Sequence, residues 1–316
     1  MRLLLRVLLA LLLAVLLIAL VLTTIGAFYQ PNTQIPAGFL GQHVSVNGLP
    51  IRVYQRGTGP DVLLIHGSPG SLEDFAPIFR ALGTRFRLTA FDRPGHGFSG
   101  DSGKYSPADN AEVADALLTQ LELNDAIVVG HSYGGATTLA LALRKPARAN
   151  AYVVLDSATY TPLRALPPIY KVLGVPYFGI GVASVLGAFI APTRIHDELR
   201  KIWRSAPDDF ITLRTRIWST PKVSHALARE TLDAGAALSA QSPHYPAISQ
   251  RVSILAQADD PDRKRTAERL HHEIAGSTLE LLPDTGHYVQ FEKTEDVVRA
   301  IESLAPQPSE DEDEEL

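Results

Sequence analysis

Residues 128–143, VVGHSYGGATTLALAL, decide how the rest of the chain is interpreted. Two β-branched valines end an apolar run, a glycine-rich turn follows, and an alanine- and leucine-rich run comes straight after it. This order predicts a buried strand, a sharp turn and a helix. The turn places Ser132 in a G-x-S-x-G motif, which displays a nucleophilic serine only in such a strand-to-helix context. A serine in a purely structural turn is the alternative, and the rest of the chain must decide between them.

Apolar strands alternate with amphipathic helices on both sides of this turn. Strands are predicted within 61–68, 85–97, 126–132, 151–158, 251–257 and 277–283, and helices within 71–83, 106–123, 134–145, 263–274 and 294–304. A hairpin is predicted at 43–57, because Asn47-Gly48 is a preferred pair for a type I′ turn. The pattern predicts an α/β fold with a mostly parallel central sheet flanked by helices.

The alternation stops near residue 160 and resumes near 251. We therefore predict a core of 43–160 and 251–305 with an inserted helical cap over 161–250. Residues 172–193 of this cap contain no charged residue. An apolar lid or acyl-pocket wall is the favoured interpretation, because proline and glycines oppose a stable isolated helix. An interfacial membrane contact and a second membrane span are the alternatives.

The N-terminal segment predicts a membrane anchor. Residues 7–29 form a 23-residue apolar run, which as a helix spans roughly 34 Å at about 1.5 Å per residue. We expect a transmembrane helix over 1–29 and a linker over 30–42. A cleaved signal peptide is the alternative, but its apolar core is usually about 7–15 residues long. Arg2 and Arg6 precede the run, so the folded domain is expected outside the cytoplasm, in the periplasm of a Gram-negative cell.

Composition and charge exclude several kinds of site. The chain has no cysteine, so disulfides and cysteine-based sites are excluded. The net charge of −5 becomes +1 when the six acids of 310–315 are set aside. We expect 306–316 to be a disordered acidic tail. No basic stripe accompanies the core, so nucleic acid is not an expected partner.

A second glycine motif, G-x-G-x-x-G at 95–100, predicts no dinucleotide site. It follows Arg93-Pro94 and opens no clear helix, whereas nucleotide-binding glycines lead into one. Asp92 and Arg93 beside it are interpreted as an internal ion pair.

A nucleophilic serine needs a base, and the base needs an acid. Among ten histidines, His287 fits best, because it follows the last predicted strand and a glycine. His131 is expected to point away from the serine. Candidate acids stand where strands end: Asp156 after one strand, and Asp259, Asp260 and Asp262 after the next. Chain order favours Asp260, with Asp259 and Asp156 as alternatives.

Five motifs together resemble the α/β-hydrolase superfamily, particularly bacterial carboxylesterases and haloperoxidase-type enzymes: HGSPGS (66–71), DRPGHGFS (92–99), GHSYGG (130–135), Asp260-Pro261 and GHYVQFE (286–292). The resemblance spans about 43–305. It implies Ser132 as nucleophile, His287 as base, Asp260 as acid, and the backbone N–H groups of Ser68 and Tyr133 as oxyanion hole. Gln257 departs from the family, which usually has glycine three residues before the acid.

The resemblance also implies a reaction. It predicts a serine hydrolase that cleaves small-molecule carboxylic esters through an acyl-enzyme, without a metal or organic cofactor. Serine at position 132 disfavours the superfamily's dehalogenases and epoxide hydrolases, which use aspartate there. The apolar cap favours a hydrophobic acyl or alcohol group. Alternatives are C–C or amide hydrolysis, acyl transfer or cofactor-free peroxidation on the same residues, or an inactive tethered binding protein. The sequence does not indicate an oligomeric state.

Overall fold

The computed structural model describes residues 2–161, 167–203 and 206–306. Most of the expected acidic tail, 307–316, lies outside the described residues. The centre is an eight-stranded sheet in the order β1-β2-β4-β3-β5-β6-β7-β8. Its strands are β1 Gln42–Val46, β2 Leu49–Arg56, β3 Asp61–Ile65, β4 Arg87–Phe91, β5 Ala126–His131, β6 Ala149–Leu155, β7 Arg251–Gln257 and β8 Thr278–Leu282.

The sheet is mostly parallel, as the alternation predicts. β3 to β8 pair in parallel, whereas β1 and β2 run antiparallel at one edge. β1 and β2 form the predicted hairpin, with Val46 paired to Leu49. Asn47 and Gly48 both have positive φ, 51° and 81°, which is the type I′ geometry that this residue pair favours.

Helices cover both faces of the sheet. The helices of the core are α2 Ala76–Leu82, α3 Pro107–Gln120, α4 Tyr133–Arg144, α9 Pro261–Glu273, α10 Val289–Glu292 and α11 Thr294–Leu304, and short 3₁₀ turns lie at Leu72–Phe75 and Ser242–Ala247. The side chains of β3 show both layers. Leu63 and Ile65 pack with apolar residues of α3 and α4, whereas Val62 and Leu64 pack with those of α2 and α11. Both faces of the strand are therefore buried, which explains its continuous apolar run.

α3 begins where its sequence predicts. The Ser106 side chain accepts a hydrogen bond from the Asp109 N–H, and Pro107 occupies the first turn. Such a cap satisfies a backbone donor that the helix itself leaves without an acceptor.

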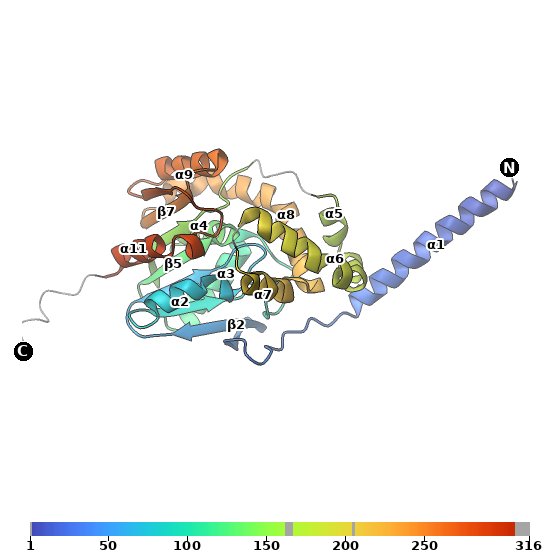
Figure 1. Ribbon diagram of the computed structural model, residues 1–316, viewed down its shortest axis with the longest axis horizontal. Coiled ribbons are helices and arrows are strands. Elements are labelled where there is room, and N and C mark those ends of the chain that lie inside the picture. The colour runs from blue at the N-terminus through green and yellow to red at the C-terminus, as the bar shows by residue number, and fades with distance from the viewer. Residues whose placement is uncertain (1, 162–166, 204–205, 307–316) are drawn as a thin grey trace, which may run out of the picture.

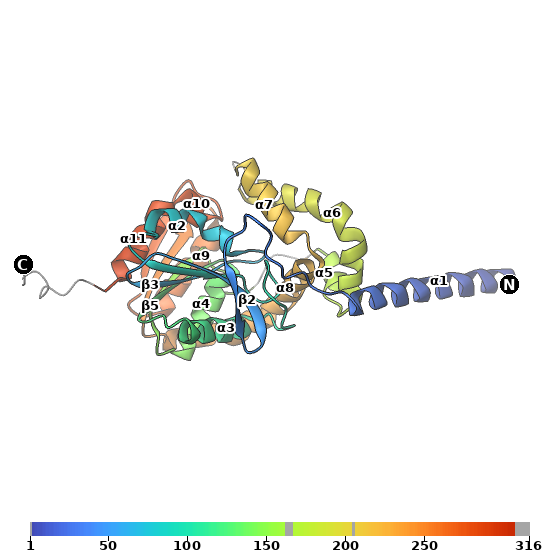
Figure 2. The same cartoon turned by 90° about the horizontal axis from the view of Figure 1, so that it is seen from below.

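In the described part of the chain between β6 and β7, four α-helices occur: α5 Ile169–Leu173, α6 Phe178–Ile202, α7 Asp208–Trp218 and α8 Pro221–Gln241. They gather on one side of the sheet, next to the base of α1 (Figures 1 and 2). α1, Arg2–Ala27, projects away from the rest of the molecule, and its most apolar 18-residue window has a mean hydropathy of 3.1 and no buried surface. Its length and composition are those of a membrane span or a signal sequence.

Candidate active site

Ser132 lies in the turn between β5 and α4. Its φ of 54° and ψ of −116° are rarely adopted by a residue with a side chain, and such backbone conformations cost of order 1–3 kcal/mol. The turn is held from several sides. The Ser132 N–H donates to the Leu155 carbonyl at 2.9 Å, and its carbonyl accepts from the N–H groups of Gly135 and Ala158 at 3.0 and 3.1 Å. These hydrogen bonds hold Ser132 in its strained backbone conformation, which is typical of functional turns.

The glycines of the motif are required by close packing. A Cβ atom on Gly134 would lie 2.1 Å from the Ile65 carbonyl oxygen and 2.5 Å from that of His66. A Cβ atom on Gly130 would lie 2.2 Å from the Gly134 oxygen. The start of α4 thus rests directly on the end of β3. Only a hydrogen atom, and no side chain, fits at Gly130 and Gly134.

His287 and Asp156 are hydrogen-bonded. The His287 Nδ1 donates to the Asp156 Oδ2 at 2.5 Å, and the Asp156 side chain is fully buried whereas that of His287 is 19% exposed. A proton held on Nδ1 leaves Nε2 as a proton acceptor, which is the tautomer that a general base needs. Ser132 and His287 line the same cavity.

This pairing corrects the acid expected from the sequence. Asp260 instead caps α9, where its Oδ1 accepts from the N–H groups of Asp262 and Arg263 at 2.9 and 3.1 Å. The Asp259 Oδ2 accepts from the Asp284 N–H at 2.8 Å. β6 and β7 are parallel neighbours, so acidic residues after either strand emerge at the same edge of the sheet, and chain order alone could not separate them.

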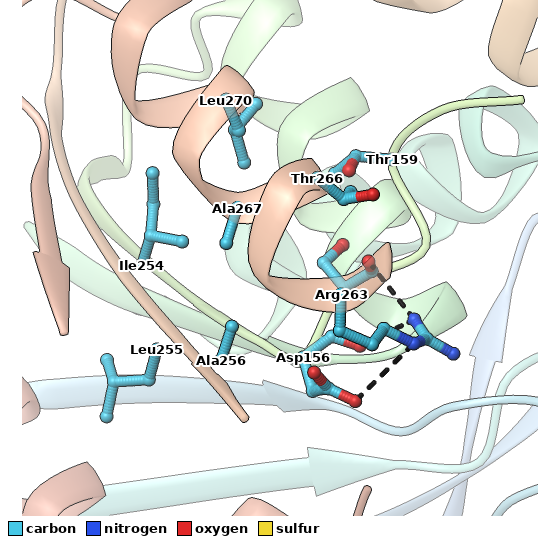
Figure 3. Close-up of a pocket in the computed structure, with 10 residues that line it drawn as sticks. Asp156, Thr159, Ile254, Leu255, Ala256, Arg263, Thr266, Ala267 and Leu270 are labelled. Carbon is cyan, nitrogen blue, oxygen red and sulfur yellow. Dashed lines mark hydrogen bonds and ion pairs between the residues drawn. The ribbon is translucent and has the colours of Figure 1, made fainter. Parts of the chain in front are cut away.

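Three side chains contact the Asp156 carboxylate. Besides His287, the Gln257 Nε2 donates to Oδ2 at 2.9 Å, and the Arg263 Nε lies 3.7 Å from the same oxygen. Figure 3 shows the Arg263 side chain extending from α9 to Asp156. Burial by itself raises the pKa of Asp156, but the hydrogen bond and charge of His287, followed by Arg263 and Gln257, lower it from 3.8 to about 2. The carboxylate is therefore ionised throughout the neutral range.

Gln257 was the signal in the sequence that pointed to this arrangement. It stands where the family usually has glycine before the acid, and the structure shows its amide on Asp156 at the end of the neighbouring strand. If the Gln257 amide is taken as a hydrogen-bond donor to the catalytic carboxylate, Asp156 is favoured over Asp260.

His131 packs against His287, and its expected orientation away from Ser132 stays a prediction. The two rings lie 4.6 Å apart, and the His131 Nε2 donates to the His287 carbonyl at 2.7 Å. Burial, followed by the charge of His287, lowers the pKa of His131 to about 3. His131 is therefore a neutral donor that holds the loop carrying His287.

A buried ion pair joins α8 to the loop that follows β4. Arg93 and Glu230 of α8 form this pair, and the Ser68 hydroxyl donates to the same carboxylate. The Arg93 Nη2 also donates to the Gly67 carbonyl at 2.8 Å. The expected pairing of Asp92 with Arg93 is wrong, because Asp92 instead pairs with the buried Arg52 at 3.2 Å. Sequence alone gave no signal for Glu230, which lies far along the chain.

The two residues expected to form the oxyanion hole flank Ser132. Tyr133 is the first residue of α4, so its N–H has no acceptor within the helix and lies at the positive end of the helix dipole. Its ring is held in place, because the hydroxyl donates to the Tyr105 carbonyl at 2.8 Å and Arg93 lies 5.0 Å from the ring centre. Ser68 lines the same cavity as Ser132.

The cavity measures about 620 Å³ and extends from Ser132 and His287 into the cap. Its walls are mostly apolar, and those from the cap include Leu173, Val182, Leu186, Ile190, Leu199 and Leu227. Arg194 and Glu198 are its charged lining residues. Within the described ranges, no group of three or more histidine and acidic side chains is arranged to hold a metal ion. The site can thus offer a nucleophile, a base and an apolar chamber.

Comparisons with known proteins agree with this geometry. A model of the alpha/beta hydrolase family matches residues 62–300. The chain is 37% identical over 125 residues to 2-hydroxymuconate semialdehyde hydrolase from Pseudomonas putida, covering 37% of this chain and 43% of that protein. It is 34% identical over 106 residues to a pimeloyl-[acyl-carrier protein] methyl ester esterase from Nitrosospira multiformis, covering 33% of this chain and 40% of that one. Both alignments span less than half of the relative.

The fold is also shared with solved structures. An alpha/beta hydrolase fold protein from Burkholderia ambifaria superposes with a TM-score of 0.69 at 21% identity, over 83% of this chain and 97% of the other. The family match extends across the parallel strands β3 to β8, the Ser132 turn and the His287 loop. The chain therefore belongs to the alpha/beta hydrolase family.

Proposed function

We propose that this protein is a membrane-anchored serine hydrolase that cleaves carboxylic esters with a hydrophobic acyl or alcohol group. The observation that carries the proposal is one constellation: Ser132 on a strained turn, His287 on the same cavity, and Asp156 hydrogen-bonded behind His287. The family match supports hydrolysis as the reaction class.

The proposed reaction runs through an acyl-enzyme. The His287 Nε2 takes the proton from the Ser132 hydroxyl as its oxygen attacks the acyl carbonyl. Asp156 stabilises the imidazolium that forms. His287 then returns the proton to the leaving alcohol and later activates a water molecule, which releases the acid and regenerates Ser132.

The backbone N–H groups of Ser68 and Tyr133 are proposed to bind the oxyanion. Donors already in place where charge develops contribute about 3–4 kcal/mol each to transition-state stabilisation. The Arg93–Glu230 pair supports this role, because it holds the Ser68 side chain from one side and the Tyr133 ring from the other.

The cavity supports an apolar substrate. Its volume of about 620 Å³ lies within the usual range for small-molecule sites, and the walls contributed by α6 are aliphatic apart from Arg194 and Glu198. A medium or long acyl chain would bury its surface against these apolar walls, which is favourable in proportion to the area removed from water.

A fluorophosphonate probe tests the nucleophile directly. We expect the folded full-length protein to be labelled and Ser132→Ala to be unlabelled, with Ser102→Ala, an exposed serine, as the matched control that retains labelling. An ester panel of graded acyl length then tests the substrate class. Equal labelling of wild type and Ser132→Ala, or hydrolysis that is fastest for acetyl esters, would contradict the respective part of the proposal.

C–C bond hydrolysis is the second candidate, because one relative is named a 2-hydroxymuconate semialdehyde hydrolase. Both reactions use the same serine, so labelling does not separate them. Vinylogous 1,5-diketone substrates assayed beside the ester panel do, since an esterase leaves them intact.

A further inference from the structure

The first two helices of the cap expose large apolar side chains. On α5, α6 and the turn between them, the exposed members are Ile169, Val175, Tyr177, Val185, Leu186, Phe189, Ile190 and Ile202. Phe189 is 82% exposed. Between residues 167 and 193, Lys171 is the only charged residue. An apolar patch of this extent marks an interaction surface, because single exposed hydrophobic residues are ordinary but clusters are not. We call these eight residues the cap patch.

The cap patch adjoins the base of α1. A Cβ atom on Gly26 would lie 1.7 Å from the Tyr177 carbonyl oxygen, and one on Gly181 would lie 1.8 Å from that of Leu22. The backbones of α1 and α6 are therefore in direct contact at glycines, as in the close helix crossings of membrane proteins. α1 leaves the molecule beside α5 and α6 (Figures 1 and 2).

α6 is bent where the cap patch is most exposed. Phe178–Gly187 and Phe189–Ile202 meet at 84°, so the helix does not cross a bilayer as one straight span. If α1 spans a bilayer, its contact with α6 lies near the end of the hydrocarbon, and the bend turns the half of α6 that begins at Phe189 away from the axis of the first half. Lys171, which is exposed, can reach phosphate groups at this level.

The cavity opens at the same face. Leu186 and Ile190 line the cavity and are also 47% and 45% exposed. Ile169 and Ile202 likewise belong to both the cavity lining and the cap patch. A molecule that enters past these side chains would pass from apolar surroundings into an apolar chamber.

We propose that the cap patch inserts into the bilayer that holds α1, and that the cavity takes its ester directly from that bilayer. The substrate class is then a membrane-resident ester with a long hydrocarbon chain. This inference rests on the proposed function for both the anchor and the hydrolase. The occupant of the cap patch is lipid because the patch is continuous with a helix of membrane-spanning length and composition.

Membrane depth can be measured with one label, because the chain has no cysteine. Phe189→Cys is labelled with an environment-sensitive fluorophore in the full-length protein, reconstituted into vesicles that carry a nitroxide quencher on the lipid acyl chain. Ser303→Cys on α11, exposed and remote from α1, is the matched control. We expect blue-shifted, quenched emission at position 189 and water-like, unquenched emission at position 303.

Two fluorescence outcomes would overturn the inference. Water-like emission at position 189 would mean that the cap patch does not reach the bilayer. Blue-shifted emission without quenching by lipid-borne nitroxide would mean that protein, either a partner or a second copy, covers it. If the wild-type chain does not remain with vesicles at all, the proposed anchor fails as well, and the inference fails with it.

Activity tests the route of the substrate separately. Phe189 lies outside the cavity lining, so we expect Phe189→Asp to lower kcat/KM by about tenfold toward a long-chain ester embedded in vesicles. The same variant should leave hydrolysis of a short water-soluble ester within about twofold of wild type, because the reacting groups are untouched. Equal loss on both esters, or no loss on either, would overturn the route. Absence of turnover and of fluorophosphonate labelling in the wild type would instead overturn the proposed hydrolase.

Discussion

At the residue scale, the site depends on which aspartate forms the hydrogen bond to His287. Asp156 is buried and bonded to His287, Gln257 and Arg263, whereas Asp260 accepts from the first N–H groups of α9. The two aspartates therefore differ in role: Asp156 binds His287, whereas Asp260 caps the N-terminus of α9. Substituting each by its isosteric amide separates these roles.

We expect Asp156→Asn to lower kcat on a soluble ester by roughly 10³- to 10⁴-fold, because an amide favours the wrong histidine tautomer and does not stabilise the imidazolium. Asp260→Asn should stay within about twofold, since asparagine caps a helix as well as aspartate does. Steady-state kinetics, with thermal melting to verify folding, checks both. A large loss in Asp260→Asn with a small one in Asp156→Asn would restore Asp260 as the acid.

Glu230 makes the protein sensitive to acid. Burial raises its pKa, but Arg93 and then His96 lower it from 4.5 to about 2. Because the folded state holds the carboxylate ionised more strongly than the unfolded state does, its contribution is complete above pH 4.5 and is lost as the pH falls through about 2. The difference corresponds to about 3 kcal/mol.

We expect Glu230→Gln to lower the Tm at pH 7, because Arg93 is left buried without its counter-charge, at a cost of about 3–5 kcal/mol. The gap between wild type and variant should narrow as the pH is lowered from 5 to about 3. Melting curves in detergent at several pH values measure this gap. Asp233→Asn, an exposed member of a surface pair on the same helix, should change the Tm little at any pH. A gap independent of pH would contradict the ionised state of Glu230.

At the element scale, the catalytic turn depends on how closely α4 approaches β3. The helix begins at Tyr133, directly after Ser132, and Gly134 rests against the carbonyl groups at the end of β3. Any side chain there must push the start of the helix away from the sheet. The position of Ser132 and of the Tyr133 N–H would move with it.

We expect Gly134→Ala to destabilise the fold by about 1–3 kcal/mol through overpacking and to lower kcat by roughly 10²-fold, because displacements near 1 Å at a reacting group have that effect. Gly235→Ala on α8 is the matched control, since its Cβ would meet no atom within 4 Å. Alanine in place of that helical glycine should stabilise by about 0.5–1 kcal/mol. Full activity in Gly134→Ala would show that the start of α4 accommodates a Cβ atom without moving Ser132, which would contradict the prediction.

At the scale of the whole molecule, α1 and the C-terminal end of the described chain lie on opposite sides (Figure 1). α5 and α6 lie between α1 and the sheet, and α11 lies on the far side from α1 (Figure 2). A fusion at the C-terminus should therefore leave the site unobstructed.

We expect alkaline phosphatase fused after residue 316 to be active and green fluorescent protein fused there to be dark, because Arg2 and Arg6 precede the apolar helix and positive flanks remain inside. Paired alkaline phosphatase and green fluorescent protein fusions measure this in a bacterial host. Fluorescence without phosphatase activity would reverse the proposed orientation.

The chain's local patterns determined the sheet, the hairpin at Asn47-Gly48, the start of α3 and the turn that carries Ser132. These features depend on residues close in sequence, where alternation, capping and glycine spacing act directly. The sequence also singled out His287 as the candidate base, because it lies in a loop after the last predicted strand.

Only the tertiary structure decided which groups meet across the sheet and the cap. Asp156 and Asp260 follow neighbouring parallel strands. Which of them meets His287 depends on how the ends of these strands pack against the loop that carries His287, which is a contact between residues far apart in the chain. Glu230 reaches Ser68 and Arg93 across 162 and 137 positions of chain. The apolar run at 172–193 was visible in the sequence, but its bend, its contact with α1 and its share in the cavity arise from packing between distant elements.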